Sequence, residues 1–162
     1  METVTVRRVI AAPIADVFAW CSTTTNYTRS PFVLKARLAR PGRGAPYGVG
    51  AIRQHTWLIG WFRERVTTYN PPYDFDYTVE RSYPPARHEL GRMTFTEVAE
   101  GTLVVWTTTF RIPGPLGGII ARRIGKPVIS HVFGRILDAG AGALTEGRGV
   151  FPAPGFRREP GE

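Results

Sequence analysis

Residues 61–81 read WFRERVTTYNPPYDFDYTVER, and this stretch decides the fold. Apolar and polar side chains alternate on both sides of Asn70-Pro71-Pro72, as is typical of two strands joined by a turn. Because the link is short, the two strands are expected to pair antiparallel as a hairpin. The stretch therefore predicts an antiparallel sheet in the middle of the chain.

The same alternation continues outward in both directions along the sequence. Turn-forming pairs and triplets, such as Ile59-Gly60, Tyr83-Pro84-Pro85 and Glu100-Gly101, separate the alternating segments. We therefore expect an antiparallel meander, with further strands at residues 2–10, 34–38, 49–58, 89–98 and 102–112.

Helical spacing appears at two places outside the meander. Ile14, Val17, Phe18 and Cys21 follow one another at helical intervals after Pro13, which predicts a short amphipathic helix, and residues 27–32 predict a second short helical piece. After residue 115 the apolar period becomes about four, which predicts one long helix over residues 116–146. Interior glycines and Pro127 weaken that helix locally, so we expect tertiary packing to hold it and a kink near Pro127.

These elements predict an α+β fold in which a curved antiparallel sheet wraps around one long C-terminal helix, with two short helices after the first strand. Only the last helix is long enough to cover the apolar face of the sheet. A strongly twisted sheet around one helix tends to leave a hollow between them. We therefore expect one ligand-binding domain over residues 1–146 with an internal cavity, followed by a flexible tail at 147–162.

Three stretches resemble the START-like superfamily, also called SRPBCC, and within it the polyketide cyclase/dehydratase-like branch. They read VIAAPIADVFAW at residues 9–20, RVTTYNPP at 65–72 and FTEVAEGTLVVW at 95–106, and the C-terminal helix follows them. The resemblance covers nearly the whole of residues 4–146 and implies a helix-grip fold with a cavity between sheet and helix. It implies no single activity, because similar proteins include aromatase/cyclases, hydratase-like enzymes and lipid carriers.

Composition narrows the chemistry further. Cys21 is the only cysteine, the N-terminal residues do not have the pattern of a signal peptide, and no apolar run has the ~18 residues needed to cross a bilayer, so we expect a cytoplasmic protein. The three histidines have no metal-ligand spacing and no cofactor motif is present, so no metal and no cofactor are predicted. The net charge of +8 leaves contact with an anionic membrane open, while scattered arginines make nucleic acid a poor candidate.

Alternation along the strands selects the side chains that face the hollow. Glu64 lies between the inward positions of Phe62 and Val66. Buried without a partner, it would have a raised pKa suited to acid/base catalysis; the alternative is an ion pair with a nearby arginine. Tyr77 can orient a carbonyl and His131 can carry protons, which completes the candidate catalytic set. The candidate ligand-binding residues are Trp57, Phe62, Val66, Phe75, Met93, Phe95, Trp106, Thr108, Phe110, Ile124 and Val128.

A basic cluster of Arg122, Arg123 and Lys126 leaves docking on an anionic membrane or nucleic acid open as a third function. Two ligand-binding functions stand before it. The first is an enzyme that promotes cyclisation or dehydration of a polyketide-like or aromatic molecule, by confining it and moving protons through Glu64 with Tyr77 or His131. The alternative is a non-catalytic carrier or sensor of a lipid or other hydrophobic metabolite. Either function predicts a small hydrophobic ligand as the partner, and the sequence leaves monomer and homodimer equally open.

Overall fold

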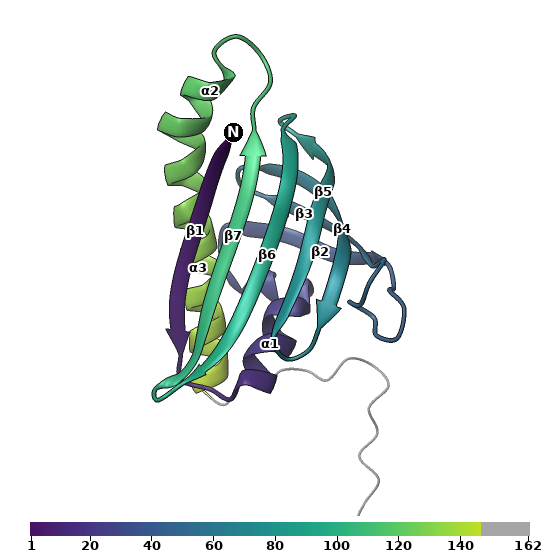
Figure 1. The fold of residues 1–162 in the computed structure, drawn as a ribbon, viewed down its shortest axis with the longest axis vertical. Coiled ribbons are helices and arrows are strands. Elements are labelled where there is room, and N and C mark those ends of the chain that lie inside the picture. The colour runs from purple at the N-terminus through teal and green to yellow at the C-terminus, as the bar shows by residue number, and fades with distance from the viewer. Residues whose placement is uncertain (147–162) are drawn as a thin grey trace, which may run out of the picture.

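The computed structural model describes residues 1–146, and the predicted tail at 147–162 lies outside the described residues. The sheet has seven strands: β1 (Glu2–Ile10), β2 (Val33–Arg40), β3 (Ile52–Trp57), β4 (Gly60–Asn70), β5 (Asp74–Tyr83), β6 (Arg87–Val98) and β7 (Gly101–Arg111). Every neighbouring pair is antiparallel, in the order β1-β7-β6-β5-β4-β3-β2. The expected meander is confirmed. The first strand, β1, pairs with the last strand, β7, and forms one edge of the sheet (Figure 1).

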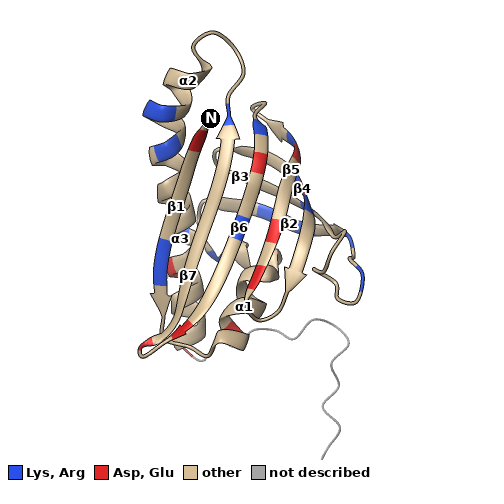
Figure 2. Cartoon of the chain, in the orientation of Figure 1, with Lys and Arg blue, Asp and Glu red and all other residues tan. Residues whose placement is uncertain are grey.

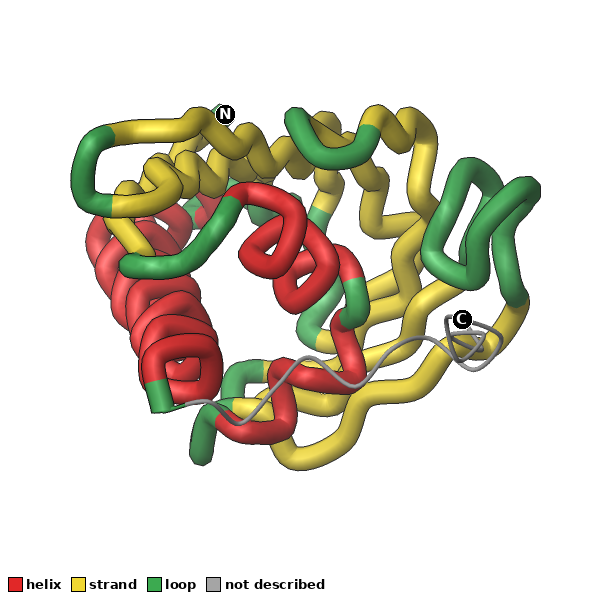
Figure 3. Tube along the Cα trace, turned by 90° about the horizontal axis from the view of Figure 1, so that it is seen from below, coloured by secondary structure: helices red, strands yellow, loops and turns green. Residues whose placement is uncertain are grey.

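The helices lie on one side of the curved sheet. Helix α1 (Ile14–Ser22) and the 3-10 helix η1 (Thr24–Arg29) follow β1, and the second of these covers residues somewhat earlier than the predicted 27–32. The C-terminal helical region begins with α2 (Gly117–Ile120), continues as a π-helical segment η2 (Ala121–Gly125) and ends in α3 (Lys126–Thr145). Seen from below, the strands curve around these helices (Figure 3). The α+β class and the helix-grip arrangement are therefore confirmed.

The irregularity expected near Pro127 takes the form of the π-helical segment just before it. Pro127 is the second residue of α3, and Gly125 and Lys126 just before it keep helical dihedral angles. A π segment within a helix is a recognised source of bends and frequently marks functional regions. The C-terminal helical region is thus continuous along the chain but changes its geometry between residues 121 and 126.

Packing against the sheet holds α3 despite its glycines. Ile136 and Leu137 are fully buried, and the Phe133 ring stacks on Trp106 of β7 with ring centroids 3.7 Å apart. Gly140 allows the helix to approach Trp20 of α1, because a Cβ atom there would lie 2.8 Å from the indole ring. This close contact requires glycine at position 140, although a glycine inside a helix lowers stability by about 1 kcal/mol relative to alanine. Within residues 1–146, no helix is both long and apolar enough to cross a bilayer.

Candidate functional site

A cavity lies between the concave face of the sheet and α3. It contains about 600 Å³ of space free of protein atoms, a figure that includes the open solvent at its mouth. Apolar and aromatic side chains dominate its wall, with a few polar groups among them. The lining residues are His55, Trp57, Ile59, Phe62, Glu64, Tyr77, Val79, Ser82, Ala86, His88, Thr108, Phe110, Ile129 and Phe133.

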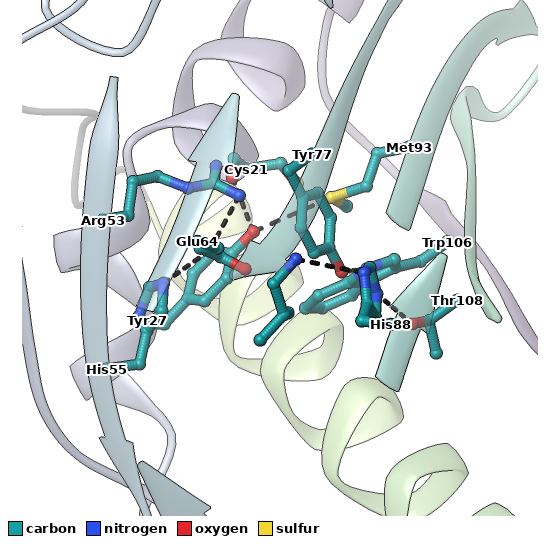
Figure 4. A network of polar contacts seen from close by, with 11 residues as sticks. Cys21, Tyr27, Arg53, His55, Glu64, Tyr77, His88, Met93, Trp106 and Thr108 are labelled. Atoms are coloured by element: carbon teal, nitrogen blue, oxygen red, sulfur yellow. Dashed lines mark hydrogen bonds and ion pairs between the residues drawn. The ribbon is translucent and has the colours of Figure 1, made fainter. Parts of the chain in front are cut away.

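A buried charge cluster occupies the inner end of this cavity. The β3–β4 hairpin places Arg53 directly opposite Glu64, and both side chains are almost completely buried. The Oε1 atom of Glu64 lies 2.8 Å from Nη2 of Arg53 and 2.6 Å from Nε2 of His55 (Figure 4). Arg53, His55 and Trp57 alternate along β3, so their side chains share the inward face. The guanidinium of Arg53 also lies over the rings of Phe75 and Tyr77.

The cluster keeps Glu64 ionised at neutral pH. Burial alone would raise its pKa, but the charges of Arg53 and His55, together with the hydrogen bond from His55, outweigh burial and lower the pKa to about 2. The raised pKa expected for a Glu64 without a partner does not arise, and the alternative of an ion pair with an arginine describes the site. An ionised Glu64 serves as a hydrogen-bond acceptor and not as a proton donor.

A second polar group lies beside the charge cluster, on β5, β6 and β7. Tyr77 packs its ring on Gly91, where a Cβ atom would lie 2.2 Å from Cζ of the ring, so only glycine fits at that position. The Tyr77 hydroxyl accepts a hydrogen bond of 2.8 Å from Nε1 of Trp106. Burial, followed by the negative charge of Glu64, raises the pKa of Tyr77, which therefore keeps its proton.

His88 completes this second group and has a defined tautomer. Its ring stacks on Tyr77, and its Nδ1 atom accepts a hydrogen bond of 3.1 Å from the backbone N–H of Val79. The proton must therefore lie on Nε2, which donates to Oγ1 of Thr108 at 2.8 Å. Burial lowers the pKa of His88, and the negative charge of Glu64 opposes that change in part. His88 is thus a neutral, fixed part of the wall.

The predicted site residues fall into three groups. The cavity is lined by Trp57, Phe62, Glu64, Tyr77, Thr108 and Phe110. A second group is buried in the core around the cavity without lining it: Val66, Phe75, Met93, Phe95 and Trp106. These five share the inward orientation expected from strand alternation, but neighbouring side chains cover them.

The third group, on the C-terminal helical region, points elsewhere. Ile124 is 60% exposed, and Val128 and His131 are also exposed, so none of them lines the cavity. His131 places its ring against the edge of Phe32 instead. Residues four apart in an α-helix are rotated by about 40° relative to one another, so a row of residues at this spacing turns away from the sheet along the C-terminal helical region. The inward residues of α3 that line the cavity are Ile129 and Phe133.

Sequence reasoning missed both cavity histidines and the arginine of the cluster. A tight turn at Leu58-Ile59 makes Trp57 the partner of Gly60, and counting back along the hairpin puts Arg53 opposite Glu64. That register was available from the sequence. His88 lies at the start of β6, one residue before the predicted start of the strand, so it was left outside the sheet. Among residues 1–146, no group of three His, Cys, Asp or Glu side chains is arranged to hold a metal ion.

Comparisons with known proteins agree with this architecture. Solved structures with the same fold include TTHA0849 from Thermus thermophilus, with a TM-score of 0.74, 14% identity, and coverage of 90% of this chain and 99% of that chain. The Aha1 dimer from Colwellia psychrerythraea gives a TM-score of 0.63 at 15% identity, covering 92% and 100%. The di-domain ARO/CYC StfQ from the steffimycin biosynthetic pathway gives 0.60 at 16% identity, covering 91% of this chain and 46% of StfQ.

At these identities the structural neighbours show the shared fold alone. No curated protein matches the sequence significantly. The sequence profile of the family described as "Polyketide cyclase / dehydrase and lipid transport" matches residues 1–146, which is the whole described chain. That range includes the three stretches that carry the resemblance, every strand of the sheet and every residue that lines the cavity. The chain therefore belongs to the polyketide cyclase/dehydrase and lipid transport family, within SRPBCC.

Proposed function

We propose that the chain binds one small, mainly apolar organic molecule in the cavity between the sheet and α3. The observation that carries this proposal is the lining of the cavity, which is largely apolar and gathers its few polar groups at defined places. Family membership is consistent with a hydrophobic ligand. We also propose a cytoplasmic location, which agrees with Cys21 being a free, buried thiol.

The polar groups of the wall suggest the chemistry of the ligand. Ionised Glu64 uses Oε1 for both Arg53 and His55, and within the described residues no hydrogen bond is made to its Oε2 atom. A hydroxyl group of the ligand can donate to that oxygen, while the rings of Trp57 and Phe62 contact an apolar body. We therefore propose a hydroxylated aromatic or polyketide-like molecule as the ligand class.

Blocking the cavity tests this proposal. Ala86 lines the cavity and is only half-buried, so Ala86→Trp is expected to fill the space without removing any core side chain. An apolar fluorescent probe such as 1-N-phenylnaphthylamine is expected to bind the wild type and to lose at least about tenfold in affinity in the variant. Ala99→Trp, in the exposed turn between β6 and β7, is the matched control and should bind like the wild type. Equal probe affinity in all three proteins contradicts the proposal.

A second candidate function is cyclisation with loss of water in the same cavity. The His55–Glu64 contact of 2.6 Å favours it, because the carboxylate orients the imidazole through Nε2, while Nδ1 has no hydrogen-bond partner in the described part of the chain and can serve as the base in proton transfer. Confinement of a flexible chain next to such a base would supply much of the rate enhancement. In this version His55 takes the proton-transfer role that the sequence suggested for Glu64 together with Tyr77 or His131.

The His55→Gln variant separates binding from catalysis. Glutamine can still donate a hydrogen bond to Glu64, but it cannot accept and release a proton as imidazole does. Both proteins are purified from the same host and their bound molecules are identified by native mass spectrometry. If the chain is an enzyme, the molecule bound to the variant is expected to be one water heavier than the molecule bound to the wild type, or to be its uncyclised isomer. The same molecule in both proteins would support binding without catalysis.

A further inference from the structure

The part of the chain between β7 and the first turn of α3 exposes several large apolar side chains. Leu116, Ile119, Ile120, Ile124 and Val128 are all exposed, with fractions between 37% and 62%. Large apolar side chains that are exposed together within one short segment often mark an interaction surface. We call these five side chains, together with the cations between them, the Leu116–Val128 surface.

The charge of this surface is entirely positive. The sequence from Arg111 to Leu137 contains no Asp or Glu, and the helical turns below the α2 label in Figure 2 carry blue segments alone. Arg122 and Arg123 are exposed, and neither forms an ion pair within residues 1–146. Lys126 lies 3.5 Å from Glu2 and is therefore partly neutralised. Two guanidinium groups without a counter-charge in this part of the chain thus lie among exposed isoleucines.

The surface lies at the end of the molecule where the cavity opens. The inner wall residues His55, Glu64 and Tyr77 are buried, whereas Ser82, Ala86 and Ile129 at the other end are half-buried. Register places the β3–β4 and β5–β6 turns at that end of the sheet, and α2 lies at the same end (Figure 1). Further exposed apolar side chains, Leu58 and Tyr83, come from these two turns.

We propose that the Leu116–Val128 surface docks on an anionic lipid bilayer, with the cavity mouth toward the membrane. Isoleucine and leucine side chains would enter the boundary between headgroups and acyl chains, and Arg122 and Arg123 would contact the anionic headgroups. A second copy of the chain fits poorly, because a symmetric contact would bring these arginines together. Nucleic acid would leave the isoleucines without a contact. The proposal goes beyond ligand binding and does not require an occupied cavity.

Vesicle co-sedimentation tests the docking. The full chain is expected to bind vesicles of phosphatidylcholine mixed with phosphatidylglycerol, with affinity that falls as salt rises, and to bind pure phosphatidylcholine weakly. Ile119→Ser/Ile124→Ser and Arg122→Gln/Arg123→Gln should each lose about tenfold or more in affinity for the anionic vesicles. Unfolding midpoints close to that of the wild type establish that each variant remains folded.

Two control variants match the chemistry of these changes at other places. Val9→Ser/Tyr73→Ser removes exposed apolar groups, and Arg40→Gln/Arg43→Gln removes two charges near the loop after β2; both should bind vesicles like the wild type. The proposal is overturned if the controls lose as much affinity, if neutral and anionic vesicles bind equally, or if neither binds. It is also overturned if the protein binds duplex DNA with an affinity that the isoleucine variant retains. Loss of probe binding in the cavity would not affect these readouts.

Discussion

Glu64→Gln is expected to lower the free energy of unfolding by about 3–5 kcal/mol. The substitution keeps the size of the side chain but removes the only negative charge, among the described residues, that contacts the guanidinium of Arg53, which is 2% exposed. A buried cation without a counter-charge pays its full desolvation cost, and burial prevents water from replacing the carboxylate. Urea unfolding followed by tryptophan fluorescence measures the loss.

Two further variants give this prediction a control and a rescue. Asp76→Asn removes the counter-charge of Arg92, whose side chain is half-exposed, and it is expected to cost much less because water solvates Arg92. Arg53→Met/Glu64→Gln leaves no unpaired charge in the cluster and should recover most of the loss. A Glu64→Gln loss below about 1 kcal/mol, or one equal to that of Asp76→Asn, would contradict the role assigned to the cluster.

The same ion pair predicts how stability depends on pH. The pKa of Glu64 falls from its ordinary value of 4.5 to about 2 in the folded protein, so its contribution is complete above pH 4.5 and is lost as the pH falls toward 2. The size of that contribution is about 3 kcal/mol in the wild type. Glu64→Gln should lack this component, so the two stability curves converge in acid.

Phe133→Ala is expected to cost about 3–5 kcal/mol and to enlarge the cavity. The Phe133 ring stacks on Trp106, contacts Trp57 edge-on and lines the cavity, so its removal breaks the main contact between α3 and the sheet at this point. The indole rings on either side are held by the sheet and cannot collapse fully into the space. Thermal and urea unfolding measure the loss.

Ligand rescue distinguishes a cavity from general loosening. Loss of the ring leaves apolar space between Trp57 and Trp106, and benzene binds apolar cavities, so benzene should raise the unfolding midpoint of Phe133→Ala by more than it raises that of the wild type. Phe32→Ala is the comparison, since Phe32 is half-buried and should cost less. A cost no greater than that of Phe32→Ala, with no response to benzene, would show that Phe133 does not connect the helix to the sheet.

Strand alternation was sufficient to predict the sheet and much of the inward face from the sequence. Phe62, Tyr77, Thr108 and Phe110 line the cavity as the period of two requires. The pattern cannot show which inward residues are covered by others, because that depends on helices far away in sequence. Phe75 and Phe95 illustrate this limit, since both pack against Phe18 of α1 and not against the cavity.

Electrostatic pairing was harder to predict than orientation. Glu64 was identified as a buried carboxylate, but its partners Arg53 and His55 belong to β3, and Trp57 was the only residue of that strand selected for the inward face. The sign of its pKa shift depends on those partners and not on burial alone. On the C-terminal helical region, the four-residue stripe misplaced Ile124, Val128 and His131 because a helix has 3.6 residues per turn and the π segment changes its phase again.

The pairing of the first strand with the last has a consequence for biosynthesis. Glu2 of β1 lies opposite Phe110 of β7, so a nascent chain emerging from the ribosome carries β1 long before its partner exists. Contacts of such large sequence separation form slowly, and an unpaired strand is open to wrong pairing in the meantime. The hairpins from β2 to β7 can form as they emerge, whereas β1 joins the sheet only after residue 111 has left the exit tunnel.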